Sequence, residues 1–330
     1  MENIKTNSLK GNDFYVSLAP HIRSKDTVTK IMLDVIIALI PALIGSVYFM
    51  GIRALWMTLI CVVSCVCAEY IIQRILKKPV QIRDLSAVVT GILIAFNLPI
   101  KFPFWMAIFG CFFTMIIVKE CFGGIGQNFM NPALAARIVL MASWAKDMTS
   151  YIDYNSIASS TFDGVVQATP LQMIKAGTFE GLPPLQDMII GRCYGVIGET
   201  SAILLAIGGI YLIIRGVISW KTPVVFIGTT IVFLFIFGVP ANIIPYEVFG
   251  GGLFLGAFFM ATDYASSPAN GKGKLIFAFG CGLITALIRT KASLPEGVSY
   301  AICLMNVASP LIDRLTKTQA YGEAKKWKNL

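Results

Sequence analysis

Apolar and polar positions occur in long blocks along this chain, and the apolar blocks fall into two groups around one longer polar stretch. Most of them approach the ~17–25 residues that a helix needs to cross a bilayer. The five blocks before the polar stretch and the five after it are Ile31–Met50, Leu55–Leu76, Ser86–Leu98, Phe102–Val118, Pro132–Met148, Gly195–Ile214, Thr222–Phe237, Glu247–Thr262, Lys274–Arg289 and Gly297–Ile312. The pattern predicts about ten transmembrane helices, of which the third and the eighth are short for a full span.

The two groups share an internal repeat. In each, a short apolar segment ends near an Asn or Asp and a Pro, one helix follows, and a second segment carries Asn close to Pro. The first copy reads G-I-L-I-A-F-N-L-P at 91–99 and G-G-I-G-Q-N-F-M-N-P-A at 123–133. The second reads G-A-F-F-M-A-T-D-Y-A-S-S-P at 256–268 and P-E-G-V-S-Y-A-I-C-L-M-N-V-A-S-P at 295–310. Because five is an odd number, we expect two inverted repeats, 31–148 and 195–313, whose broken or short helices meet near the membrane midplane.

Composition supports an all-α integral membrane protein. The 330 residues are 56% hydrophobic and only 14% charged, with a mean hydropathy of +0.73. A soluble domain carries about 25% charged residues, so this chain has too little polar surface to cover itself in water. Its first thirty residues are polar and basic, unlike a cleavable signal peptide.

The net charge of +9 reflects membrane orientation rather than nucleic-acid binding. In a ten-helix arrangement that starts inside, 19 Lys and Arg lie on one side and seven on the other, with one, Arg137, inside a helix. Basic residues concentrate on the cytoplasmic side. We therefore expect a cytoplasmic arm at 1–30, a basic cytoplasmic tail at 314–330 and an outer loop at 149–194.

Cysteine and histidine usage limits the chemistry. Most of the eight cysteines lie in apolar helices, where Cys behaves as a small hydrophobic residue. Their spacing lacks the paired C-x2-C pattern of a zinc site, so no metal site is expected. Cys121, beside a Gly-rich turn, is open to a role at a subunit contact or an iron–sulfur centre. His21 is the only histidine, which excludes a His-based catalytic centre.

Four polar residues in the interrupted segments are candidates for binding: Asn128, Asn131, Asp263 and Asn306. Backbone groups freed by Pro and Gly must bind one another, water, an ion or a ligand. The alternative is tight helix packing, for which small residues are common. Asp263 and Asn306 are the candidates for an ion route, since a carboxylate at a helix centre costs ~2.5–3.5 kcal/mol and is usually functional. Glu69 has a simpler interpretation, a structural pair with neighbours on its own helix.

Several long motifs resemble a known family. They are A-P-H-I-R-S-K-D-T-V-T-K-I-M-L-D-V-I-I-A-L-I-P-A at 19–42, G-G-I-G-Q-N-F-M-N-P-A-L-A-A-R, M-A-T-D-Y-A-S-S-P and P-E-G-V-S-Y-A-I-C-L-M-N. They are similar in order to the family that holds the D component of the Rnf complex and the B component of the sodium-pumping NADH:quinone reductase. The resemblance extends from residue 19 to about residue 314. The short N-terminal arm resembles the Rnf branch, and the quinone-reductase branch is the alternative.

The resemblance implies a bacterial inner-membrane electron-transfer subunit, inactive alone, in a complex that couples ferredoxin:NAD⁺ oxidoreduction to Na⁺ or H⁺ translocation. It implies the A, B, C, E and G components of the Rnf complex as partners, with membrane lipid around the chain. Family members carry FMN joined through a phosphoester to a threonine in a motif like D-x-x-(S/T)-G-A-T, attached by a flavin transferase. Asp163, Gly164, Ala168 and Thr169 fit that motif, and Val166-Gln167 stands where Ser-Gly is common. The resemblance also allows a second flavin, riboflavin, for which Asn128 and Asn131 are the candidate contacts.

Thr169 meets the physical requirements of an acceptor in the sequence. It is a hydroxyl, on a loop expected to be accessible, on the outer side indicated by the charges. Pro170 biases it toward an extended backbone, so we expect its side chain to stand clear of a helical turn. Two other functions share the repeat pattern: a urea-channel-like transporter and a purely structural anchor for other subunits. Fold alone does not separate them.

Overall fold

The computed structural model describes residues 26–152, 166–178, 182–192, 195–199 and 201–317. Asp163, Gly164 and His21 lie outside the described residues, as do most of the predicted arm and tail. The described chain is helical apart from one pair of two-residue strands. The first half contains α1 (Val28–Met50), α2 (Ile52–Ile75), η1 (Ile82–Asp84), α3 (Ser86–Phe96), α4 (Phe104–Phe113), the π-helical η2 (Thr114–Lys119), η3 (Glu120–Phe122), α5 (Pro132–Ser143) and α6 (Ala145–Met148).

The connecting region and the second half are also mostly helical. They contain β1 (Tyr151–Ile152), β2 (Val166–Gln167), α8 (Pro170–Lys175), α9 (Leu185–Ile190), η4 (Ile197–Glu199), α10 (Ala202–Ile214), α11 (Lys221–Ile236), α12 (Ile244–Phe249), α13 (Leu253–Leu255), the π-helical η5 (Gly256–Met260), α14 (Gly271–Lys291) and α15 (Val298–Leu315). The strands pair antiparallel, with Tyr151 opposite Gln167.

The predicted multi-pass helical fold is confirmed. Each of the ten apolar blocks contains a helix, and four helices are long and apolar enough to cross a bilayer: α1, α2, the continuous stretch Phe104–Phe122 and α14. The third block forms the short α3, as expected. The eighth is broken into α12, α13 and η5 at consecutive glycines, of which Gly251 adopts a left-handed φ of 66°. The sixth helix begins later than predicted, at Ala202, after the separate turn η4.

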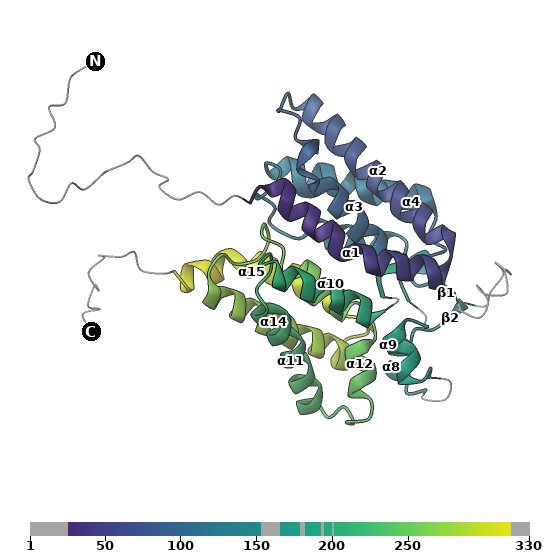
Figure 1. Ribbon diagram of the computed structural model, residues 1–330. Coiled ribbons are helices and arrows are strands. Elements are labelled where there is room, and N and C mark those ends of the chain that lie inside the picture. The colour runs from purple at the N-terminus through teal and green to yellow at the C-terminus, as the bar shows by residue number, and fades with distance from the viewer. Residues whose placement is uncertain (1–25, 153–165, 179–181, 193–194, 200, 318–330) are drawn as a thin grey trace, which may run out of the picture.

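The two halves use the same pairs of neighbouring helices. In the first, α2 packs on α3 and α4, and α5 packs on α3 and α4; in the second, α11 packs on η5 and α14, and α15 packs on the same two. The halves meet along α1 with α10 and along α5 with α15, and Figure 1 shows α1 and α10 side by side. This correspondence is what a two-repeat plan requires, while the repeat boundaries stay a prediction.

The ends of the described helices also separate in space. The start of α1 and the end of α15 lie at one end of the molecule, whereas β1, β2, α8 and α9 lie at the opposite end (Figure 1). Large apolar side chains such as Ile44, Tyr48, Ile214 and Phe235 are exposed along the outer helices. A soluble protein rarely exposes so much contiguous apolar surface, and in a bilayer these side chains meet lipid.

The contact between α1 and α10 depends on Gly208. A methyl group added there would lie 2.1 Å from the carbonyl oxygen of Ala38, a backbone atom that moves only with its helix. We expect Gly208→Ala to push the two helices apart and lower the free energy of unfolding by about 1–3 kcal/mol. Gly228→Ala, in α11, is the matched control, because nothing lies within 4 Å of the added carbon. Thermal unfolding of both purified variants measures the difference, and equal stabilities would contradict the close contact.

Candidate functional site

A cavity of about 460 Å³ lies between the two halves and brings three predicted residues together. Asn128, Asn131 and Asp263 all line it, with apolar side chains from α1, α3 and η5 around them. Its size falls within the ~300–1,000 Å³ of small-molecule sites, which are mostly apolar with a few placed polar groups. Both π-helical stretches border it, through Lys119 at the end of η2 and Phe259 in η5.

Asn131 and Asn306 hold the halves together beside this cavity. The Asn131 side chain caps α5, accepting hydrogen bonds from Ala133 N (3.0 Å) and Leu134 N (3.3 Å), and its amide donates to Met260 O of the second half (3.4 Å). In the amide orientation that satisfies its partners, Asn306 accepts from Asn131 N (3.0 Å) and donates to Ser266 O (3.1 Å). Asn306 is not among the residues that line the cavity, so its contact is with Asn131 and not with the cavity itself.

Asn128 differs from its neighbours because one of its polar atoms has no partner. The residue is 8% exposed, and its Oδ1 makes no hydrogen bond. The glycines before it, Gly123, Gly124 and Gly126, all adopt left-handed φ values, which explains the Gly-rich turn that places Asn128 at the cavity. A buried acceptor left unpaired costs about 1–3 kcal/mol, so this oxygen is a natural point for a ligand N–H.

Asp263 is partly exposed and closes a local turn. It accepts hydrogen bonds from Ser266 Oγ (2.9 Å) and Ala265 N (3.4 Å). The arrangement leaves Asp263 at the cavity wall with both oxygens already engaged by the chain.

Lys119 is buried and lines the same cavity from the end of η2. Its Nζ lies 2.5 Å from Glu69 Oε1 and 2.6 Å from Ser86 Oγ, and its side chain is 2% exposed. The expected pairing of Glu69 with neighbours on its own helix is therefore wrong, because Gln73 bonds Glu120 instead (3.0 Å). The packing of α2 against η2 brings in a partner from 50 residues away, which the pattern within one helix does not reveal.

Thr169 caps α8, which lies at the end of the molecule opposite the start of α1 (Figure 1). Its backbone is extended, as expected, with φ −64° and ψ 155°. Its side chain does not stand clear of a helical turn, however: Oγ1 accepts from Gln172 N (3.3 Å), and Gln172 Oε1 accepts from Thr169 N (2.9 Å). Pro170 opens α8, so Thr169 becomes its N-cap in a capping box. Thr169 is 5% exposed, whereas Ala168 is exposed.

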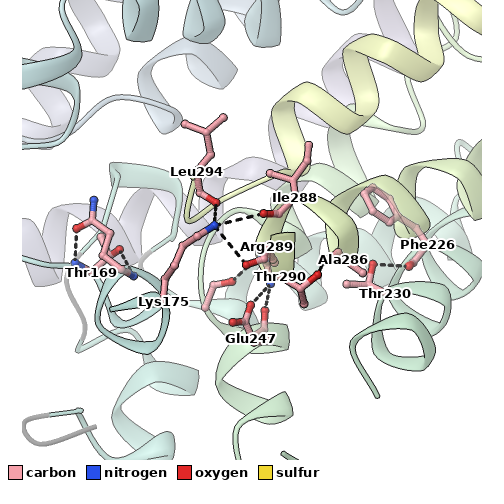
Figure 2. A network of polar contacts seen from close by, with 12 residues as sticks. Thr169, Lys175, Phe226, Thr230, Glu247, Ala286, Ile288, Arg289, Thr290 and Leu294 are labelled. Carbon is pink, nitrogen blue, oxygen red and sulfur yellow. Dashed lines mark hydrogen bonds and ion pairs between the residues drawn. The ribbon is translucent and has the colours of Figure 1, made fainter. Parts of the chain in front are cut away.

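The segment that carries Thr169 is anchored to the second half through Lys175. Figure 2 shows its Nζ donating to the carbonyl oxygens of Ile288, Arg289 and Leu294, at and just beyond the end of α14. Burial lowers the pKa of this ammonium, and the nearby carboxylate of Glu247 opposes the shift. Arg289 in turn binds Glu247, with 3.2 Å between Nη1 and Oε2. No pattern in the sequence indicates this anchoring lysine.

A second charged cluster, which sequence reasoning missed, lies beside Thr169. Arg137 of α5 hydrogen-bonds Glu296 and Asn97 Oδ1 (2.8 Å), and its Nη1 lies 3.9 Å from Glu199 Oε1. Glu199, Glu296 and Thr169 line one small cavity of about 10 Å³. The only signal in the sequence was a lone arginine inside an apolar helix, since its carboxylate partners come from the other half.

Metal binding finds no support in the part of the chain that the structure describes. No group of three or more His, Cys, Asp or Glu there is arranged to hold a metal ion. Cys121 is exposed and unpaired with another cysteine, at the surface near the Gly-rich turn. Its suggested role at a subunit contact or an iron–sulfur centre stays a prediction.

These features define a multi-pass helical membrane protein with a ligand-sized cavity between two similarly packed halves. Residues 15–322 match the model of the NQR2, RnfD, RnfE family, and the chain belongs to that family. It is 51% identical to the D component of the Na⁺-translocating ferredoxin:NAD⁺ oxidoreductase complex of Acetobacterium woodii, over 94% of this chain and 96% of the relative. It is 41% identical to the D component of the proton-translocating ferredoxin:NAD⁺ oxidoreductase complex of Clostridium ljungdahlii, over 95% and 98%. Identity to the D component of the ion-translocating oxidoreductase complex of Aliivibrio salmonicida is 31%, over 94% and 99%.

Proposed function

We propose that this chain is the membrane electron-transfer component D of an Rnf-type complex, which couples ferredoxin:NAD⁺ oxidoreduction to cation translocation. The observation that carries the proposal is the match over nearly the whole of both chains to two relatives whose names state that activity. Those names differ in the ion, Na⁺ for one and the proton for the other, so the proposal is a monovalent cation. The chain works with the A, B, C, E and G components of the Rnf complex in the bacterial inner membrane.

Covalent FMN on Thr169 is the second part of the proposal. Thr169 is the hydroxyl that matches the family motif, and it caps α8, which lies at the end of the molecule opposite the start of α1 and the end of α15 (Figure 1). If those ends are cytoplasmic, as the distribution of Lys and Arg indicates, Thr169 faces the outer side, where the flavin transferase acts. The flavin would supply one- and two-electron transfer, while the protein holds and orients it.

The geometry at Thr169 is compatible with a phosphoester at Oγ1, and it restricts where the attached FMN lies. Esterification replaces the hydroxyl hydrogen, and Oγ1 uses a lone pair rather than that hydrogen to cap α8. The adjoining cavity of about 10 Å³ holds at most about one water. An attached FMN therefore extends outward, on the side where Ala168 is exposed.

A non-covalent riboflavin in the 460 Å³ cavity is the third part. The unpaired Oδ1 of Asn128 supports it, because the pyrimidine edge of a flavin presents N–H donors. We expect Asn128→Leu to reduce the flavin released on denaturation about 2–10-fold, the affinity worth of one hydrogen bond. Gln127→Leu, at an exposed position of the same turn, is the control. Equal release from all three proteins would remove Asn128 from the site.

The test of covalent FMN is in-gel fluorescence of the denatured chain, expressed with its transferase and partner subunits. We expect a fluorescent band from the native chain and none from Thr169→Ala, because no hydroxyl remains. Thr169→Asn separates the acceptor from the cap, since Asn is a strong N-cap without a hydroxyl. It should also be dark while keeping normal amounts of chain in the membrane.

Thr178→Ala is the matched hydroxyl control in the same loop. Its Oγ1 donates to Met173 O (3.1 Å), and its loss should leave the band bright. A fluorescent Thr169→Asn band would contradict the assignment of Thr169. A dark native band, together with solute flux through liposomes that hold this chain alone, would favour the transporter alternative instead.

A further inference from the structure

Three charged side chains from both halves meet between the helices near Thr169. Arg137 comes from α5, Glu199 from η4, and Glu296 from the turn before α15. Arg137 hydrogen-bonds Glu296, and its Nη1 lies 3.9 Å from Glu199 Oε1. Exposed fractions of the Arg137, Glu199 and Glu296 side chains are 5%, 4% and 17%. The cluster is therefore almost entirely removed from bulk water.

The charges in this cluster do not balance if both carboxyl groups are ionised. Two carboxylates then face one guanidinium, whose other hydrogen bond goes to neutral Asn97. Tyr151 of β1 and Tyr300 of α15 also lie beside Arg137, and neither side chain supplies a cation. The neighbouring cations point elsewhere: Arg289 is paired with Glu247, and the Lys175 ammonium donates to three carbonyl oxygens.

Glu199 is the carboxyl group of this cluster that lacks a full set of partners. Its Oε1 is buried and accepts no hydrogen bond. Glu199 and Glu296 both line the cavity of about 10 Å³ and both lie against the Arg137 guanidinium, so the two carboxyl groups are close neighbours. Two carboxyl groups in such contact are stable only when one carries a hydrogen, as in other carboxyl pairs.

We propose that Glu199 and Glu296 bind one exchangeable proton between them, in a buried site beside Thr169. A proton fits where a hydrated ion does not, because the shared cavity holds at most about one water. Glu296 is the entry point, since it also lines a second cavity of about 70 Å³ with Thr149 and Gln172. The site rests on this chain's residues alone. If Thr169 carries FMN, a change in the charge of that flavin changes how tightly the two glutamates bind the proton. This consequence rests on the proposed function.

The experiment is infrared difference spectroscopy of the purified complex at about pH 7, in H₂O and D₂O. The native protein minus Glu199→Gln, and the native protein minus Glu296→Gln, should each show the carbonyl stretch of one protonated carboxyl group per chain, shifted by D₂O. Glu247→Gln is the matched control, because Glu247 is buried nearby with an arginine of its own. That difference spectrum should show the loss of a carboxylate stretch and no protonated carboxyl.

Two further samples keep the result decisive. Glu296→Asp retains a carboxyl group, so it should keep a protonated band if the Gln variants do not assemble. Thr169→Asn has no acceptor hydroxyl for FMN, and the protonated carboxyl band should persist in that variant. Failure of the flavin proposal and failure of the proton proposal can therefore be told apart. Ionised signals from both Glu199 and Glu296 would overturn the proposal. Carboxylate stretches that shift with Na⁺ instead of D₂O would overturn it in favour of a bound metal cation.

Discussion

Arg137→Met is expected to lower the free energy of unfolding by about 3–5 kcal/mol, because it leaves buried carboxyl groups without the guanidinium that pairs with them. Glu199 and Glu296 would then lack the guanidinium, and Asn97 Oδ1 would lose its hydrogen bond. Methionine keeps much of the arginine stem, so lost packing contributes little. Chemical or thermal unfolding of the purified complex, followed by tryptophan fluorescence, measures the loss.

Arg53→Met is the matched control. Arg53 donates to the backbone carbonyls of Ile100 (2.8 Å) and Lys101 (3.4 Å), so its removal forfeits about 0.5–1.5 kcal/mol for each hydrogen bond. Adding Glu199→Gln and Glu296→Gln to Arg137→Met should restore part of the stability, since no charge then stays unpaired. A cost for Arg137→Met no greater than that of Arg53→Met would contradict the buried cluster.

Lys119→Met is expected to have an effect of similar size, about 3–5 kcal/mol, at the opposite end of the molecule. Glu69 is 1% exposed, and its other oxygen, Oε2, already lacks a hydrogen bond. Without the ammonium group it becomes an isolated carboxyl among α2, α3 and η2. The same unfolding measurement applies, and the double variant Lys119→Met, Glu69→Gln should recover most of the loss.

Lys78→Met provides the comparison for a pair that is open to water on its lysine side. Lys78 Nζ lies 3.5 Å from Glu120 Oε2 and donates to Glu120 O (3.0 Å); the lysine side chain is 35% exposed and the glutamate side chain 2%. Because water screens the lysine end, we expect a smaller loss than for Lys119→Met, about 1 kcal/mol. If Lys78→Met proved as destabilising as Lys119→Met, burial would not be what makes the Lys119 pair matter.

Much of the fold was predictable because membrane burial leaves a strong pattern. Every apolar block contains a helix, and the short third block and broken eighth block were visible in their Gly and Pro content. Helix ends depended on particular side chains. Asn131 before Pro132 begins α5 as such pairs do. At Gly195 the sequence pattern failed, because apolar residues there form the turn η4 rather than the first turn of α10.

The polar partners were much harder to predict, because they come from distant parts of the chain. Arg137 and Glu296 are 159 positions apart, and Lys119 and Glu69 are 50 apart. A helical pattern shows which residues share a face, but not which helix packs on that face. Asn128, Asn131 and Asp263 line one cavity because each lies at an interruption and interrupted helices meet there, whereas Asn306, predicted with them, contacts Asn131 and is not part of the lining.

Thr169 shows a different limit of sequence reasoning. The extended backbone before Pro170 was expected, and it is also the conformation of an N-cap. Gln172, three residues on, was the signal for a capping box that would have predicted the observed contact. The cap fixes the position of Oγ1 at the start of α8. Thr169 also lines the cavity of about 10 Å³ together with Glu199 and Glu296.

The central claim is that Thr169 bears the covalent flavin of this chain, and peptide mass spectrometry of the native complex tests it most directly. After digestion, the peptide that contains Thr169 should carry the mass of one phosphoester-linked FMN, with fragment ions that place it on that residue. An unmodified Thr169 peptide, with flavin on another residue or wholly extractable by denaturation, would contradict the claim.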